Sequence, residues 1–153
     1  MNILVSRCLL GFPCRYDGKS TYYGELIEFI ERYKNKHNFI GICPEVDGGL
    51  PIPRATCEIV NGKVLTINGE DKTKEFIDGA NTVVDKATEY FVQVAILKSN
   101  SPSCGTGKIY DGNFSNKIIN GSGIASKMLS DFGVYVITEE ELDKIDYLLS
   151  VEE

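Results

Sequence analysis

Four short apolar runs, which alternate along the chain with segments of helical periodicity, constrain the fold more than any other feature of this sequence. The runs occupy residues 2–6, 39–43, 92–98 and 134–138. Apolar runs of this length, bounded by glycine, proline and polar residues, are typical of strands that are buried on both faces. Strands that alternate with helices predict right-handed crossovers and a mostly parallel sheet with helices on both faces. We therefore expect a three-layer, Rossmann-like α/β fold.

The segments between these runs have recognisable signals of their own. Amphipathic periodicity predicts helices over residues 21–35, 73–90, 124–133 and 138–150, and Thr138 with Glu141 has the spacing of a capping box. The pair Asn61-Gly62 lies between two β-prone runs, which predicts a small β-hairpin insertion over residues 57–69. Prolines and paired glycines in residues 44–54 argue against regular structure there. Residues 99–123 are expected to form a long irregular segment, and loops of that length are usually functional.

Length and composition limit the class of protein. A chain of 153 residues fits one domain over residues 1–153, and 42% hydrophobic with 25% charged residues is ordinary for a soluble protein. No apolar run approaches the roughly 20 residues of a membrane span, and no basic leader precedes the first run, so we expect a cytoplasmic protein. The net charge of -6 argues against nucleic acid and favours a small-molecule partner.

Three cysteines follow three different predicted strands. Cys8 lies just beyond the first strand, Cys43 ends the second, and Cys104 follows the third. In parallel α/β sheets, ligands bind beyond the carboxyl ends of the strands, so these thiols are expected to converge at one edge. Cys57 opens the predicted hairpin and is expected to lie apart from them.

Thiolates at such an edge favour zinc, copper(I) or an iron-sulfur cluster. A structural zinc site usually needs four ligands, often from a CxxC pair, and the sequence contains no such pair. A cluster held by three thiolates leaves one iron open to an exogenous ligand. Cys14 is placed either to supply a fourth ligand or to stand beside the cluster. Spacing alone leaves three alternatives open: a metal or cluster site, buried core cysteines, and a reactive thiol.

Three sequence blocks, "SRCLLGFPCRYDG", "CPEVDGGLPIPR" and "LKSNSPSCG", resemble the bacterial and archaeal thiouracil desulfidase family, long described as a domain of unknown function. The resemblance covers most of the chain. It implies a 4Fe-4S cluster bound by Cys8, Cys43 and Cys104, with one iron free of protein ligands, and Cys14 matches a further motif cysteine. It also implies that Glu45 and Ser101 are catalytically important.

The chemistry of these residue types agrees with the resemblance. A carboxylate two residues from a cluster ligand is suited to activate water, and the Ser101 hydroxyl is suited to orient that water. The expected reaction is non-redox desulfuration of a thiolated base or nucleoside, C=S to C=O with release of sulfide. Candidate substrate-binding residues are Arg15, Arg54 and Ser103, although Asp17 and Asp47 are alternative partners for the two arginines.

Two other classes of function stay open. In a binding or sensor module stabilised by zinc or a cluster, replacement of Glu45 or Ser101 would leave function intact. In a thiol redox protein that uses Cys8 and Cys14, activity would not need iron.

Overall fold

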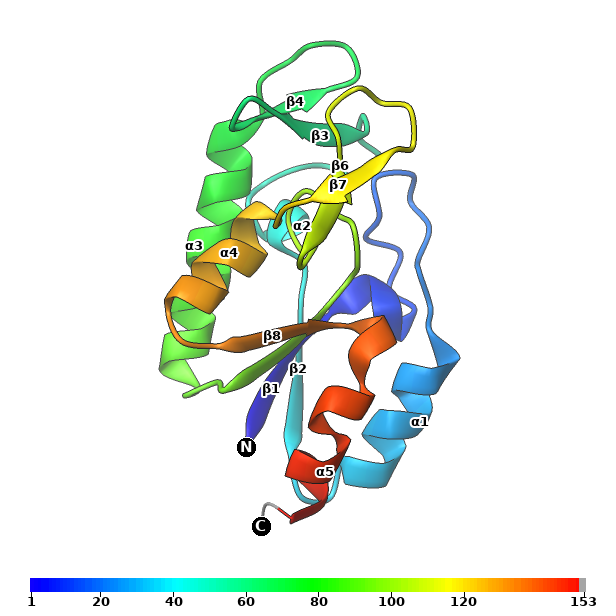
Figure 1. The fold of residues 1–153 in the computed structure, drawn as a ribbon, viewed down its shortest axis with the longest axis vertical. Coiled ribbons are helices and arrows are strands. Elements are labelled where there is room, and N and C mark those ends of the chain that lie inside the picture. The colour runs from blue at the N-terminus through cyan, green and yellow to red at the C-terminus, as the bar shows by residue number, and fades with distance from the viewer. Residues whose placement is uncertain (152–153) are drawn as a thin grey trace.

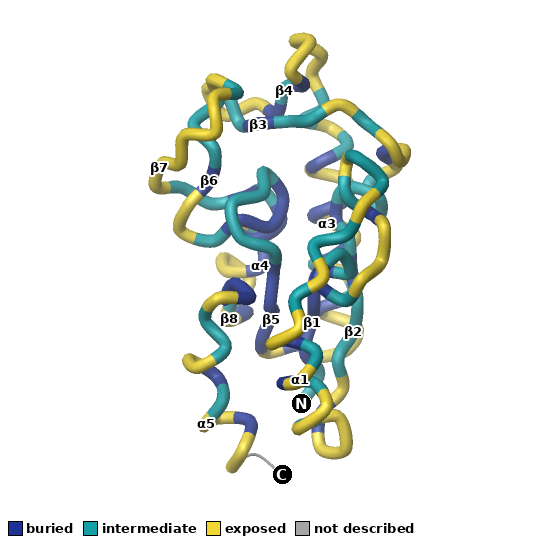
Figure 2. The backbone as a smooth tube through the Cα atoms, turned by 90° about the vertical axis from the view of Figure 1, so that its right-hand side faces the viewer, coloured by how far each residue is buried: buried dark blue, intermediate teal, exposed yellow. Residues whose placement is uncertain are grey.

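A four-stranded parallel sheet forms the centre of the computed structural model, which describes residues 1–151. Its strands are ordered β2 (Asn38–Ile42), β1 (Asn2–Ser6), β5 (Val94–Leu97) and β8 (Tyr135–Thr138). Every neighbouring pair is parallel, with Leu4 in register with both Ile40 and Ala95. Figure 2 shows the inner strands β1 and β5 as the most buried part of the chain. The expected mostly parallel sheet is confirmed.

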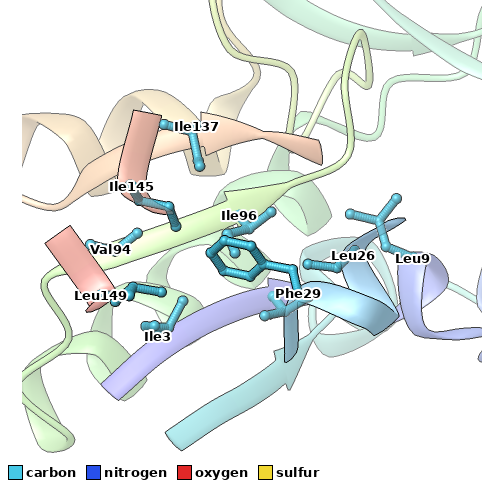
Figure 3. Close-up of a cluster of buried hydrophobic side chains, with 10 residues drawn as sticks. Ile3, Leu9, Leu26, Phe29, Val94, Ile96, Ile137, Ile145 and Leu149 are labelled. Carbon is cyan, nitrogen blue, oxygen red and sulfur yellow. The ribbon is translucent and has the colours of Figure 1, made fainter. Parts of the chain in front are cut away.

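Helices cover both faces of this sheet, as the periodicity predicts (Figure 1). On one face, α1 (Gly24–Tyr33) and α5 (Asp143–Val151) pack against alternate residues of the strands. Figure 3 shows this cluster, in which Phe29 and Leu149 meet Ile3 and Ile96. On the other face, α3 (Thr73–Glu89) and α4 (Ile124–Asp131) pack on the remaining strand residues. Because strand side chains alternate between the two faces, fully apolar strands stabilise both layers at once.

Two antiparallel hairpins extend beyond the carboxyl ends of the sheet strands (Figure 1). The hairpin β3 (Cys57–Val60) and β4 (Lys63–Thr66) turns at Asn61-Gly62, both with positive φ, as predicted. The second hairpin, β6 (Lys108–Tyr110) and β7 (Ile118–Asn120), lies inside the segment that was expected to be irregular. Its strands have three residues each, too few for an alternating pattern to appear in the sequence.

Short helices follow the first two strands and carry part of the site. A 3-10 helix, η1 (Arg7–Leu10), follows β1, and α2 (Pro44–Asp47) follows β2. The prediction of no regular structure in residues 44–54 was therefore wrong for α2, because proline at the first helical position is compatible with a helix. The predicted capping box of Thr138 and Glu141 is present, and it opens the 3-10 helix η2 (Glu139–Glu141) ahead of α5.

A contact between glycines sets the position of α2. A Cβ atom on Gly79 of α3 would lie 1.8 Å from the Pro44 carbonyl oxygen, and one on Gly48 would lie 2.1 Å from that of Glu75. Only glycine at these positions permits α2 and α3 to approach so closely. The backbone of Cys43 and Glu45 is thus held against α3.

No helix within residues 1–151 is long and apolar enough to cross a membrane.

Candidate active site

A cavity of about 640 Å³ lies where the carboxyl ends of β1, β2 and β5 meet the two hairpins. Its walls include every residue that the sequence analysis selected, namely Cys8, Cys14, Arg15, Cys43, Glu45, Arg54, Ser101, Ser103 and Cys104. Cavities of this size are typical of small-molecule sites.

Three thiols lie side by side on one wall. Hydrogen bonding with Cys14 lowers the pKa of Cys8 to about 7 and also lowers that of Cys43, whose Sγ lies 3.9 Å from the Cys14 carbonyl oxygen. The same two hydrogen bonds, with burial, raise the pKa of Cys14 itself. Cys14 acts as the hydrogen-bond donor to both Cys8 and Cys43. This favours the thiolate forms of Cys8 and Cys43 and the protonated form of Cys14, so the pKa values shift in opposite directions.

The fourth thiol, that of Cys104, is buried on the neighbouring turn. Burial raises its pKa to about 12, although the hydroxyl of Ser6 donates to its Sγ at 3.5 Å and Ser103 Oγ lies 3.6 Å from it. Cys8 and Cys43 are close enough to Cys104 to influence its pKa by their charges.

The donor set fits a cluster better than a single ion. Within residues 1–151, no group of three or more His, Cys, Asp or Glu side chains is arranged to hold one metal ion. In an iron-sulfur cluster each thiolate binds a different iron, so the ligands need not converge on one point. An all-sulfur donor set is also the one that such clusters use.

The carboxylate of Glu45, on α2, is hydrogen-bonded on both oxygens. Arg54 donates from Nε to Oε1 at 3.1 Å, and Ser103 donates from Oγ to Oε2 at 2.8 Å. The Arg54 side chain is only 7% exposed, and its other nitrogens donate to the carbonyls of Cys14 and Pro51. Each of the three guanidinium nitrogens of Arg54 therefore donates to a protein oxygen, and this arrangement fixes the orientation of Glu45.

Ser101 organises the turn that carries Cys104. Its Oγ accepts hydrogen bonds from the backbone N–H groups of Ser103 and Cys104, at 3.1 Å and 2.9 Å. It also lies 2.9 Å from Ser103 Oγ, and Ser103 itself is 2% exposed. The two serines and Glu45 thus form one continuous hydrogen-bonded chain, which the sequence analysis did not foresee because it joins separate loops.

Arg15 and Lys98 are further cationic residues on the cavity wall. Arg15 pairs with Asp17 at 2.8 Å and lies over the ring of Tyr16, 5.3 Å from the centroid. Lys98, at the end of β5, pairs at 3.1 Å with Glu139, which is 5% exposed. Lys98 and Glu139 were missed, although Lys98 ends one predicted strand and Glu139 directly follows another, which is the same signal that identified the cysteines.

The hairpins form the remaining wall. Cys57, which we expected to lie apart, also borders the cavity, and its thiol donates to the Ala55 carbonyl at 3.6 Å. Burial raises the pKa of Cys57 to about 11. Beside it stand Glu58 of β3 and the β6–β7 turn, which contributes Phe114 and Asn116.

Comparison with known proteins gives consistent matches. The sequence model that describes the 2-thiouracil desulfurase family matches residues 3–141 of this chain. Uncharacterized protein YbbK of Bacillus subtilis (strain 168) is 39% identical over 153 residues, covering 94% of this chain and 99% of that protein. A solved structure of a 4Fe-4S-dependent thiouracil desulfidase, TudS, superposes with a TM-score of 0.90 at 36% identity, covering 98% of both chains.

Proposed function

Because this chain belongs to the 2-thiouracil desulfurase family, we propose that it is a single-domain, cytoplasmic, iron-sulfur-dependent desulfidase of thiolated nucleobases or nucleosides. The observation that carries the proposal is the meeting, in one cavity, of Cys8, Cys14, Cys43 and Cys104 with the Glu45 carboxylate, which is fixed on both oxygens. The 4Fe-4S dependence of the similar TudS protein supports the choice of cofactor.

Cys8, Cys43 and Cys104 would hold the 4Fe-4S cluster, with Cys14 beside it as an additional candidate ligand. When bound, the cluster would supply a Lewis-acidic iron, free of protein ligands, with high affinity for sulfur. Ser6 donates to the Cys104 sulfur, which is the kind of supporting contact that orients a ligand.

The side chains of this chain account for the proton transfers. Glu45 accepts a proton from the attacking water while the water oxygen forms a bond to the thiocarbonyl carbon. Arg54 and Ser103 hold the Glu45 carboxylate in place, and Ser101 positions the reacting water near it. The electron pair of the breaking C–S bond leaves with sulfur, and both water protons end on sulfide. The reaction is hydrolysis and transfers no net electrons.

The test uses protein loaded with iron and sulfide without oxygen, which should convert 2-thiouracil to uracil. Glu45→Gln and Ser101→Ala should both keep the cluster, measured by iron content and absorption, and both should lose turnover, Glu45→Gln by about 100-fold to 10,000-fold. Full activity of cluster-loaded Glu45→Gln would remove Glu45 from the reaction. Absence of sulfide release from every thiolated base, with wild-type protein fully loaded, would refute the proposed function.

The contacts of Cys14 with Cys8 and Cys43 support a second candidate, a thiol redox protein. That function requires a disulfide to form and break, and it would persist after iron is removed. Turnover that depends strictly on iron excludes it.

A further inference from the structure

A buried carboxylate stands on the hairpin wall of the cavity without a cationic partner. Glu58, on β3, is 7% exposed. Within residues 1–151, no lysine or arginine forms an ion pair with it. Burial of an unpaired carboxylate is unfavourable unless hydrogen bonds compensate for the lost hydration.

Only one of its two oxygens is used by the described part of the chain. Oε1 accepts hydrogen bonds from the backbone N–H groups of Gly112 and Phe114, at 2.9 Å and 3.2 Å. A Cβ on Gly112 would lie 2.7 Å from the Ile59 carbonyl oxygen, so the β6–β7 turn lies tightly against β3. Oε2 forms no hydrogen bond within residues 1–151, although Glu58 borders the cavity.

Anchoring the turn does not explain why this residue is a glutamate. The amide oxygen of a glutamine accepts two N–H groups equally well and is less costly to bury. A carboxylate differs from the glutamine amide at its second polar atom. That atom is an oxygen that only accepts hydrogen bonds, and it carries part of the negative charge. Such an oxygen is stabilised by a ligand that brings an N–H group.

We propose that Glu58 is a specificity-determining residue whose Oε2 accepts a hydrogen bond from a ring N–H of the substrate. This rests on the proposed function and narrows its substrate class to thiocarbonyl rings that carry hydrogen on a ring nitrogen. A thiouracil ring has such an N–H beside its C=S carbon. Phe114, half-buried on the same turn, also borders the cavity, where an aromatic side chain can pack on a flat ring.

Glu58→Gln separates the anchoring of the β6–β7 turn from the binding of substrate. Glutamine keeps one oxygen that can accept from the turn, but it replaces the second acceptor oxygen with an N–H donor. We expect cluster content and melting temperature to stay unchanged, while the Kd for 2-thiouracil rises about tenfold to hundredfold. Binding is measured by anaerobic calorimetry on cluster-loaded protein. The matched control is Asp111→Asn, which changes a carboxylate of the same hairpin that bonds only within its turn, to Asn113.

A second probe needs no variant. An analogue with methyl groups on both ring nitrogens should bind wild type about tenfold to hundredfold more weakly than 2-thiouracil, and should bind wild type and Glu58→Gln equally. Equal binding of 2-thiouracil to wild type and Glu58→Gln, or undiminished binding of the analogue to wild type, would overturn the inference while leaving desulfuration intact. Glu58-dependent binding without any sulfide release would instead refute the proposed function and preserve the inference.

Discussion

Replacement of Gly79 by alanine tests how the packing of α2 on α3 positions the site. Gly79 lies in the middle of α3, where helix propensity alone predicts that alanine is better by about 1 kcal/mol. The structure predicts the opposite sign, because the new Cβ would stand 1.8 Å from the Pro44 carbonyl oxygen. Since that atom belongs to the backbone, no side-chain rotation relieves the overlap.

The size of the effect follows from the overlap. Real Cβ atoms essentially never approach another heavy atom closer than 3.0 Å, so α2 must move away by about 1.2 Å. Overpacking of this kind costs up to about 3 kcal/mol, which leaves a net loss of about 2 kcal/mol after the gain in propensity. For a chain of this length the melting temperature should fall by roughly 4–8 °C. Displacement of Glu45 by about 1 Å should lower turnover by roughly 100-fold.

Thermal unfolding, monitored by circular dichroism, measures the change in melting temperature. Sulfide release from cluster-loaded protein measures the change in turnover. The matched control is Gly24→Ala at the start of α1, where the nearest atom would be 3.9 Å from the new Cβ. That variant should be as stable as wild type or slightly more stable. A Gly79→Ala protein that melts at or above the wild-type temperature, with normal turnover, would refute this account of α2.

Two further substitutions test the assignment of roles within the cavity. Cys57→Ser should retain a full cluster, because the Cys57 thiol bonds to the Ala55 carbonyl. Cys43→Ser, in contrast, should lose the cluster. Iron analysis that shows the reverse would contradict the ligand assignment. Ser103→Ala removes the hydrogen bond to one oxygen of Glu45 and should lower kcat about tenfold or more, with little change in KM. The control is Ser126→Ala, which changes an equally buried serine bonded to Thr106 and should leave kcat unchanged. Equal kcat for the two variants would exclude a role of Ser103 in holding Glu45.

The parts of the site that the sequence predicts are those attached directly to strand ends. Residues at the carboxyl ends of adjacent parallel strands meet because the sheet itself brings them together, so Cys8 and Cys43 needed only a correct strand assignment. The contact of Ser103 with Glu45 is different, since it spans 58 positions and depends on the conformations of two loops. Loop conformation has no periodic signature in the sequence. Ser103 was therefore predicted as a candidate site residue, but its contact with Glu45 was not predicted.

The same distinction explains why the hairpin wall escaped prediction. Strands β6 and β7 have three residues each, and β7 is exposed throughout, so neither shows a buried apolar pattern. Their arrangement depends instead on single contacts, such as that of the Glu58 carboxylate with the turn. The four thiols therefore lie around the end of a sheet that is stabilised by two apolar layers, while this wall depends on a few polar contacts. Changes in the hairpins can consequently alter which ring the cavity accepts without disturbing the thiols, because the two parts of the site are stabilised by separate interactions.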